Sequence, residues 1–226
     1  MLHILLRFRI PLSGALVLAA LTPAPVLAGA AWQVDDPAIT PAGACLLESA
    51  WRGNAGRSAW ASHGACTLAR TELGIGRHWS GALDTPAAWS FAIKRPILAS
   101  EDGTALLALT VTAHWEEATN ERGDVAIQLP WRLATLGGVV PLHANLGWTQ
   151  SIEGETSLTW GLGMEAPVGD DWGFLGELHR PEAGSYEMQW GLRRHVNASL
   201  AIDALVGIDD ARNHWLGLGL SLTLQP

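Results

Sequence analysis

The chain of 226 residues is 48% hydrophobic, contains 12 tryptophans and 25 glycines, and carries a formal net charge of −8 at pH 7. An acidic chain lacks the basic face that nucleic acids require, so we expect no nucleic-acid partner. So much tryptophan beside so much glycine is unusual in a soluble enzyme, and the spacing of the apolar residues has to account for it.

Residues 1–30 have the layout of a cleavable secretory signal peptide. Arg7 and Arg9 give a positive start, an apolar run follows, and small residues at 28–30 offer a cleavage site. Prolines keep the apolar run shorter than the roughly 20 residues that a membrane-spanning helix needs. Because both arginines leave with the signal, 12 of the 14 basic side chains remain against 22 acidic ones, a net charge near −10. Residues 31–42 would then form an N-terminal segment in the periplasm.

Two cysteines, Cys45 and Cys66, follow the signal peptide. Export to an oxidising compartment makes a single disulfide the expected state. A hairpin centred between residues 55 and 56 places the two cysteines directly opposite each other, and it also pairs Trp51 with Trp60. We therefore predict a disulfide across the first hairpin. A zinc site that contains His63 and Cys66 is the alternative, but Cys45 is the better partner for Cys66.

From residue 43 onward, apolar and polar residues alternate, as in a β-strand with two different faces. Residues 216–224 show it most clearly, with leucine at every even position and glycine, serine or threonine between them. About twelve such segments follow one another, at 43–52, 58–69, 71–80, 87–96, 104–116, 124–135, 139–150, 156–166, 171–180, 185–195, 198–208 and 213–225. Most span 10–13 residues, which exceeds the soluble average of about 5–6 and suits a transmembrane strand of about 9–11. The sequence predicts an all-β fold, an antiparallel transmembrane β-barrel of about twelve strands over residues 43–226.

One face of each segment is apolar and the other is mixed. In a membrane barrel the apolar face meets lipid and the polar face lines the lumen, whereas a soluble sandwich has the reverse arrangement. The polar set that we expect in the lumen comprises Glu48, Glu72, Lys94, His114, Arg132, His143, Glu165, Glu177, His179, Arg193 and Asp203. Such charges could brace the wall by pairing, or brace it and also line a passage. The excess of carboxylates would disfavour anions in a passage, and glycines on the same face remove bulk from the lumen.

The tryptophans favour the membrane over the soluble alternative. Tryptophan is most favourable at the headgroup boundary of a bilayer. With the N-terminus in the periplasm, seven of them fall near the outer ends of their segments: Trp51, Trp60, Trp79, Trp89, Trp115, Trp148 and Trp215. Some of them, Trp215 included, fall on the lumen face by parity, so we expect an incomplete belt. We therefore expect the protein in the cell outer membrane, surrounded by outer-membrane lipid and inserted there by the barrel-assembly machinery.

Several short stretches resemble a family of outer-membrane transporters named for the meta-pathway of phenol degradation. The matching stretches are Asp35-Asp36-Pro37, Pro41-Ala42-Gly43, the strand from Cys45 to Glu48, Glu72-Leu73-Gly74-Ile75-Gly76, Gly169-Asp170-Asp171-Trp172, Gly176-Glu177, Trp190-Gly191-Leu192-Arg193, Asn197 to Asp203 and Leu216-Gly217-Leu218. They cover most of the mature chain and describe strands more than chemistry. The resemblance implies a small outer-membrane barrel that admits small hydrophobic or aromatic compounds.

Catalytic motifs are missing from the chain after the signal peptide. Its histidines are spread singly, and it has no nucleophile elbow, zinc-protease motif or phosphate-binding loop. We expect no cofactor, no metal and no enzymatic activity, and a channel for a small solute is the leading hypothesis. The alternatives are a structural barrel without transport, a lipid-modifying barrel that uses Ser62-His63 or His78 with Asp84, and a soluble periplasmic lipocalin-like binder.

Overall fold

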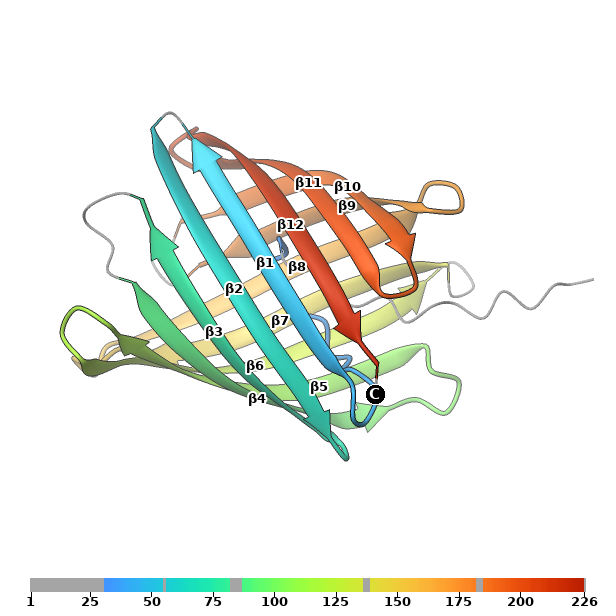
Figure 1. Cartoon of the computed structure of the whole chain (residues 1–226), viewed down its shortest axis with the longest axis horizontal. Coiled ribbons are helices and arrows are strands. Elements are labelled where there is room, and N and C mark those ends of the chain that lie inside the picture. The colour runs from blue at the N-terminus through green and yellow to red at the C-terminus, as the bar shows by residue number, and fades with distance from the viewer. Residues whose placement is uncertain (1–30, 55, 82–86, 136–138, 182–184, 226) are drawn as a thin grey trace, which may run out of the picture.

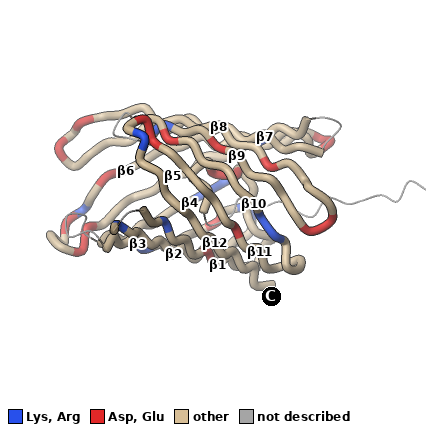
Figure 2. Tube along the Cα trace, turned by 90° about the horizontal axis from the view of Figure 1, so that it is seen from above, with Lys and Arg blue, Asp and Glu red and all other residues tan. Residues whose placement is uncertain are grey.

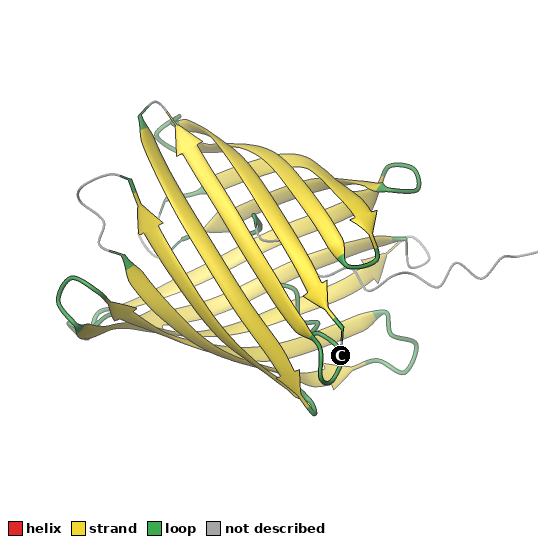
Figure 3. Ribbon diagram, in the orientation of Figure 1, coloured by secondary structure: helices red, strands yellow, loops and turns green. Residues whose placement is uncertain are grey.

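A computed structural model describes residues 31–54, 56–81, 87–135, 139–181 and 185–225. The predicted signal peptide and Asp84 lie outside these residues. Strands joined by loops make up the described chain (Figure 3). Among the described residues, none forms a helix long and apolar enough to cross a membrane.

Twelve antiparallel strands close into one barrel, in which β1 pairs with β12 (Figure 1). The strands are β1 Cys45–Asn54, β2 Arg57–Leu68, β3 Thr71–Ser80, β4 Ala88–Ala99, β5 Ala105–Glu116, β6 Glu121–Thr135, β7 Val140–Gln150, β8 Thr156–Pro167, β9 Trp172–Arg180, β10 Glu187–Asn197, β11 Leu200–Asp209 and β12 His214–Leu224. Each coincides with one predicted segment to within a few residues. The predicted fold class is confirmed.

The first hairpin has the predicted register. Cys45 lies opposite Cys66 and Trp51 lies opposite Trp60. The two cysteines form a disulfide with their Cα atoms 4.0 Å apart, so the predicted pairing is confirmed. This bond lies at the end of the barrel where β1 begins and β12 ends, here called the terminal end. The opposite end, where β1 turns into β2, is called the far end.

Alternation sorts the side chains into an apolar exterior and a polar interior. Leu146, Leu162 and Leu218 are 53%, 54% and 53% exposed on the outside, whereas Arg193 and Asp203 on the inside are each 1% exposed. Figure 2 shows that charged residues occupy only scattered positions along the chain, most of which is uncharged. Because an apolar exterior on a closed barrel is stable in lipid and unfavourable in water, the molecule has the construction of a membrane barrel.

Tryptophans near the far end form an incomplete outer belt. Trp60, Trp89, Trp115 and Trp148 are 37–46% exposed on the outer surface, and Trp60 stacks on its neighbour Trp79 with ring centroids 6.3 Å apart. The tryptophan of β12 lies on the lumen face, as its parity predicted. Trp215 is buried in the lumen, with the guanidinium of Arg52 3.7 Å above its ring, so it contributes nothing to the belt.

Candidate functional site

The barrel interior is the candidate functional site, and the first described residues of the chain run through it. Residues 31–44 precede β1, and this blue segment lies within the barrel in Figure 1. We expected residues 31–42 in the periplasm, whereas the structure brings residues 31–40 against lumen-facing side chains. The physical reason is that the peptide groups of this segment find hydrogen-bond partners on the polar wall. We call residues 31–44 the lumen segment.

Glu177 on β9 holds the start of the lumen segment. Its carboxylate accepts hydrogen bonds from the backbone N–H of Val34 at 2.8 Å and of Gln33 at 3.2 Å. Gln189 on β10 donates to the same carboxylate and to the carbonyl oxygen of Ala31, the latter at 3.0 Å. A carboxylate that accepts several N–H groups is well satisfied although it is buried.

Two bases hold the middle of the lumen segment from the opposite wall. Lys94 Nζ on β4 lies 2.5 Å from Asp35 Oδ1 and donates to the carbonyl oxygen of Asp36 at 3.0 Å. Arg132 on β6 approaches the Asp36 carboxylate at 3.7 Å. Burial raises the pKa of Asp36 to about 6, although the positive charge of Arg132 acts to lower it. The lumen bases therefore pair with this segment.

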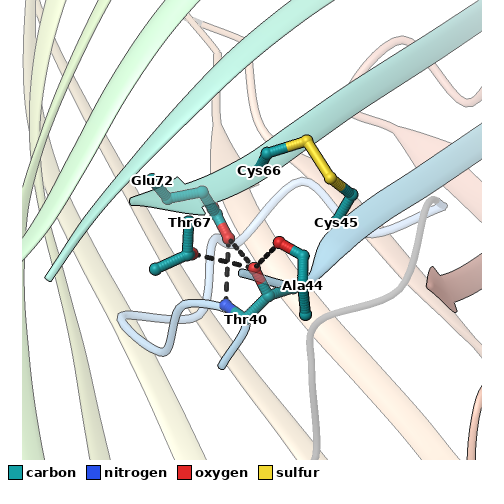
Figure 4. Close-up of a disulfide and its surroundings, with 6 residues drawn as sticks. All are labelled: Thr40, Ala44, Cys45, Cys66, Thr67 and Glu72. Atoms are coloured by element: carbon teal, nitrogen blue, oxygen red, sulfur yellow. Dashed lines mark hydrogen bonds between the residues drawn. A yellow bond between two sulfur atoms is a disulfide. The ribbon is translucent and has the colours of Figure 1, made fainter. Parts of the chain in front are cut away.

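The lumen segment is fixed again at the terminal end, beside the disulfide (Figure 4). Thr40 donates its backbone N–H to Glu72 at 3.0 Å, and its hydroxyl lies 2.8 Å from that of Thr67. Thr67 follows Cys66 on β2, and Glu72 lies opposite Thr67 on the neighbouring strand β3. The disulfide therefore braces the wall to which this part of the segment is attached.

Three lumen-facing glycines leave space for the segment. A Cβ atom at Gly161 would lie 2.7 Å from Val34 Cγ2, and a Cβ atom at Gly219 would lie 2.9 Å from the backbone nitrogen of Ala31. At Gly163 the added carbon would meet the ring of Trp32 at 3.2 Å. Distances below 3 Å require displacement of the neighbour. These glycines therefore shape a groove that fits the lumen segment.

Arg193 joins three strands of the wall. Its guanidinium forms two hydrogen bonds with Asp203, at 2.8 and 3.0 Å, and one with Glu165 at 2.9 Å. It also lies 5.5 Å from the ring centroid of Trp32 on the lumen segment. A planar guanidinium suits such a two-carboxylate arrangement, and full pairing offsets the cost of burying these charges. This cluster is a brace.

A second cluster lies near the far end and includes two residues that the sequence did not single out. Arg52 forms two hydrogen bonds with Glu187, at 2.8 and 3.1 Å, and His179 Nε2 lies 3.3 Å from the same carboxylate. Arg52 and Glu187 share the parity of the predicted lumen set, and that signal could have identified them. Their positions at strand ends concealed it.

The remaining predicted lumen residues also lie on the inner face. Glu48 accepts a hydrogen bond from Ser221 at 3.2 Å. His143 packs edge-on against Trp32, with ring centroids 5.3 Å apart, and neither ring nitrogen has a hydrogen-bond partner among the described residues. His114 lies against His78 at 6.1 Å. The described residues contain no cluster of metal-binding side chains.

Two cavities adjoin the lumen segment. One of about 300 Å³ lies between the segment and β1–β6, and its charged lining consists of Asp35, Asp36, Glu48, Glu72 and Lys94. The other, of about 430 Å³, lies toward the far end, and its polar lining consists of Gln33, Gln128, Asn145, Thr159, His179 and Arg180. We call them the acid-lined and the amide-lined cavity. Because Gln33 and Gln128 line both, the two cavities adjoin.

Comparisons with known proteins give a family and a fold. A family model described as "Uncharacterised conserved protein UCP029691" matches residues 16–224. No curated protein matches the chain. Among solved structures, the KdgM porin in complex with disordered oligogalacturonate aligns with a TM-score of 0.64 at 8% identity, over 80% of this chain and 99% of that one.

Two further channels align similarly. The NanC porin has a TM-score of 0.60 at 8% identity, over 80% of this chain and 100% of that one. The COG4313 outer membrane channel from Pseudomonas putida F1 has a TM-score of 0.58 at 12% identity, over 84% of this chain and 98% of that one. Because the sequence identities are this low, these alignments show a shared barrel fold alone.

Proposed function

We propose that this chain, which belongs to that uncharacterised conserved family, is a non-enzymatic outer-membrane channel for a small solute. The observation that carries the proposal is a closed twelve-strand barrel with an apolar exterior and two polar cavities inside. An apolar exterior suits lipid, and a polar interior suits water and solute. The shared fold with outer-membrane porins supports this role.

Both bracing and passage find support in the lumen. Arg193 with its carboxylates is buried and fully paired, so it stiffens the wall. By contrast, Glu48 and His114 line the acid-lined cavity, where a solute or water can reach them. Twelve strands enclose more space than the eight-stranded barrels that side chains just fill, and less than open sixteen-stranded porins. A narrow path beside the lumen segment is consistent with this size.

The charges of the lumen favour cations and neutral solutes over anions. Among the described residues, the acid-lined cavity is lined by four carboxylates, those of Asp35, Asp36, Glu48 and Glu72, and by one lysine, Lys94, and no arginine. Since like charges repel strongly where water is scarce, an anion would be disfavoured there. The resemblance to transporters of the meta-pathway of phenol degradation supports aromatic compounds as a second class of solute.

The lipid-modifying alternative loses support from the strand geometry. Adjacent residues of a strand point to opposite faces, so Ser62 and His63 on β2 face away from each other. The Ser62 hydroxyl lies 3.1 Å from that of Ser49, and His63 lines the acid-lined cavity. A nucleophile and its base must lie within hydrogen-bond reach, so this pair does not form a catalytic unit.

Planar bilayers test the proposal directly. We expect purified protein to produce small, stable current steps, and a potassium chloride gradient to give a reversal potential of the sign for cation preference. A protein that inserts, shown by heat-modifiable migration on gels, and conducts no ions would contradict the channel. Anion preference would contradict the charge argument alone.

A further inference from the structure

The amide-lined cavity collects hydrogen-bonding side chains that the protein itself leaves unused. Within the described residues, the side chains of Gln33, Gln128 and Thr159 form no hydrogen bond, and all three line this cavity. Gln128 and Thr159 are half-buried and Gln33 is exposed, so a solute can reach all three side chains. Three polar groups without a protein partner around one space are therefore available to hydrogen-bond a polar solute.

Two polar atoms at the far end of the same cavity are also unused. His179 Nδ1 and Arg180 Nε are buried and have no hydrogen-bond partner among the described residues. The other ring nitrogen of His179 lies 3.3 Å from Glu187, which fixes the ring. Because the Nε2–H group of the neutral ring faces that carboxylate, Nδ1 is an oriented acceptor beside the cavity, which suits a hydroxyl group of a solute.

Charge separates the two cavities. The lining of the amide-lined cavity contains no carboxylate among the described residues, whereas Asp36, Glu48 and Glu72 line its neighbour. A cation would meet Arg180 in the first cavity, and an anion would meet the carboxylates of the second. A neutral solute with many oxygen atoms avoids both penalties, and its hydroxyl groups can donate to and accept from amides.

The cavity also has a suitable size. Its volume of about 430 Å³ falls in the range of about 300–1,000 Å³ that is usual for small-molecule sites. Gly161, whose missing side chain would otherwise add bulk, lies in its wall.

We propose that the amide-lined cavity is a binding site for a small, neutral, polyhydroxylated solute of monosaccharide size. This inference rests on the proposed function, because it names the solute class of that channel. Gln33, Gln128 and Thr159 hydrogen-bond the solute hydroxyls, His179 Nδ1 accepts from one hydroxyl, and Arg180 donates to a solute oxygen atom. The acid-lined cavity is then the next space that the solute enters.

Equilibrium binding tests the site independently of transport. Purified full-length protein in detergent micelles is titrated with glucose and, separately, with benzoate, and binding is followed by saturation-transfer difference NMR against empty micelles. The test variant is Thr159→Val/Gln128→Leu, which removes hydrogen-bonding groups at similar size. The control is Thr112→Val, a lumen hydroxyl on the acid-lined side. Heat-modifiable migration shows that each variant is folded.

We expect glucose to bind the parent protein and Thr112→Val equally, and the double variant to bind it about ten-fold more weakly, since two neutral hydrogen bonds are lost. Absence of glucose binding, an unchanged affinity in the double variant, or tighter binding of benzoate would overturn the site. Glucose binding without ion conduction would support the binding site and contradict the channel. Ion conduction without glucose binding would support the channel and contradict the binding site.

Discussion

At the scale of single residues, the lumen is held together by charges that have several partners. Arg193 bonds Asp203, which lies directly opposite it on β11, and also reaches Glu165, two strands away on β8. Parity along each strand was enough to predict that these side chains share the inner face. Their pairing could not be predicted, because the contact with Glu165 depends on how the barrel curves.

Replacing Arg193 by leucine should lower the free energy of unfolding by about 3–5 kcal/mol, because the carboxylates of Asp203 and Glu165 are left buried without a partner. Its neighbour Leu192 is 46% exposed on the lipid face, so Leu192→Ala should cost much less. Urea unfolding in lipid vesicles, followed by tryptophan fluorescence, measures both. Equal losses at the two positions would show that the faces are assigned wrongly.

The disulfide allows a second prediction at this scale. Cys45→Ser/Cys66→Ser should fold into the same barrel and lose less than about 3 kcal/mol, since the loop between the cysteines is short and the hairpin already restricts it. The same unfolding assay, with and without reductant for the parent protein, gives the difference. Reaction of both cysteines with a thiol reagent in unreduced protein would contradict the bond.

At the scale of elements, the twelve strands and the lumen segment differ in how far the sequence predicted them. Alternation over ten or more residues located every strand, since the period survives small errors at the ends. Residues 31–44 have no such period, and their partners, among them Lys94 and Glu177, are scattered over the chain. Without the closed barrel, nothing local places this segment in the lumen.

Crowding the groove should displace the lumen segment. In Gly161→Ala/Gly219→Ala the new methyl groups would lie 2.7 Å from Val34 and 2.9 Å from Ala31, so the start of the segment must move away. We expect larger ionic conductance and faster maleimide labelling of a cysteine introduced at Gln33. Both are measured in planar bilayers and vesicles, respectively.

The matched control for that variant is Gly176→Ala, whose added carbon would meet its nearest neighbour at an ordinary 3.6 Å. It should conduct and label like the parent. If the crowded variant also behaves like the parent, the segment does not restrict the path. If it conducts more without faster labelling at Gln33, the effect arises elsewhere in the wall.

At the scale of the whole molecule, the number of strands and the apolar exterior indicate a location in the outer membrane. An even number of strands brings the start of β1 and the end of β12 to the same end of the barrel, and leucines and tryptophans cover the outside. The sequence predicted these properties because length, period and tryptophan placement are summed over many residues. The cavities could not be predicted, because their volumes depend on where the lumen segment lies.

The mature protein should fractionate with the outer membrane and migrate as a compact, heat-modifiable band, because a closed barrel of long strands resists detergent until it is heated. Cell fractionation followed by gels of unboiled and boiled samples checks this. Native protein in the soluble periplasmic fraction would instead favour the lipocalin-like alternative.

Solute uptake into liposomes tests the central claim most directly. Vesicles that contain purified protein are compared with empty vesicles for uptake of glucose, phenol and benzoate, each corrected for passive leakage. A channel with the lumen described above should admit glucose measurably, and benzoate least, because of the carboxylates around the acid-lined cavity. Uptake at the level of empty vesicles for all three solutes, together with acyl transfer or deacylation of the vesicle lipid, would contradict a channel and establish a lipid-modifying barrel.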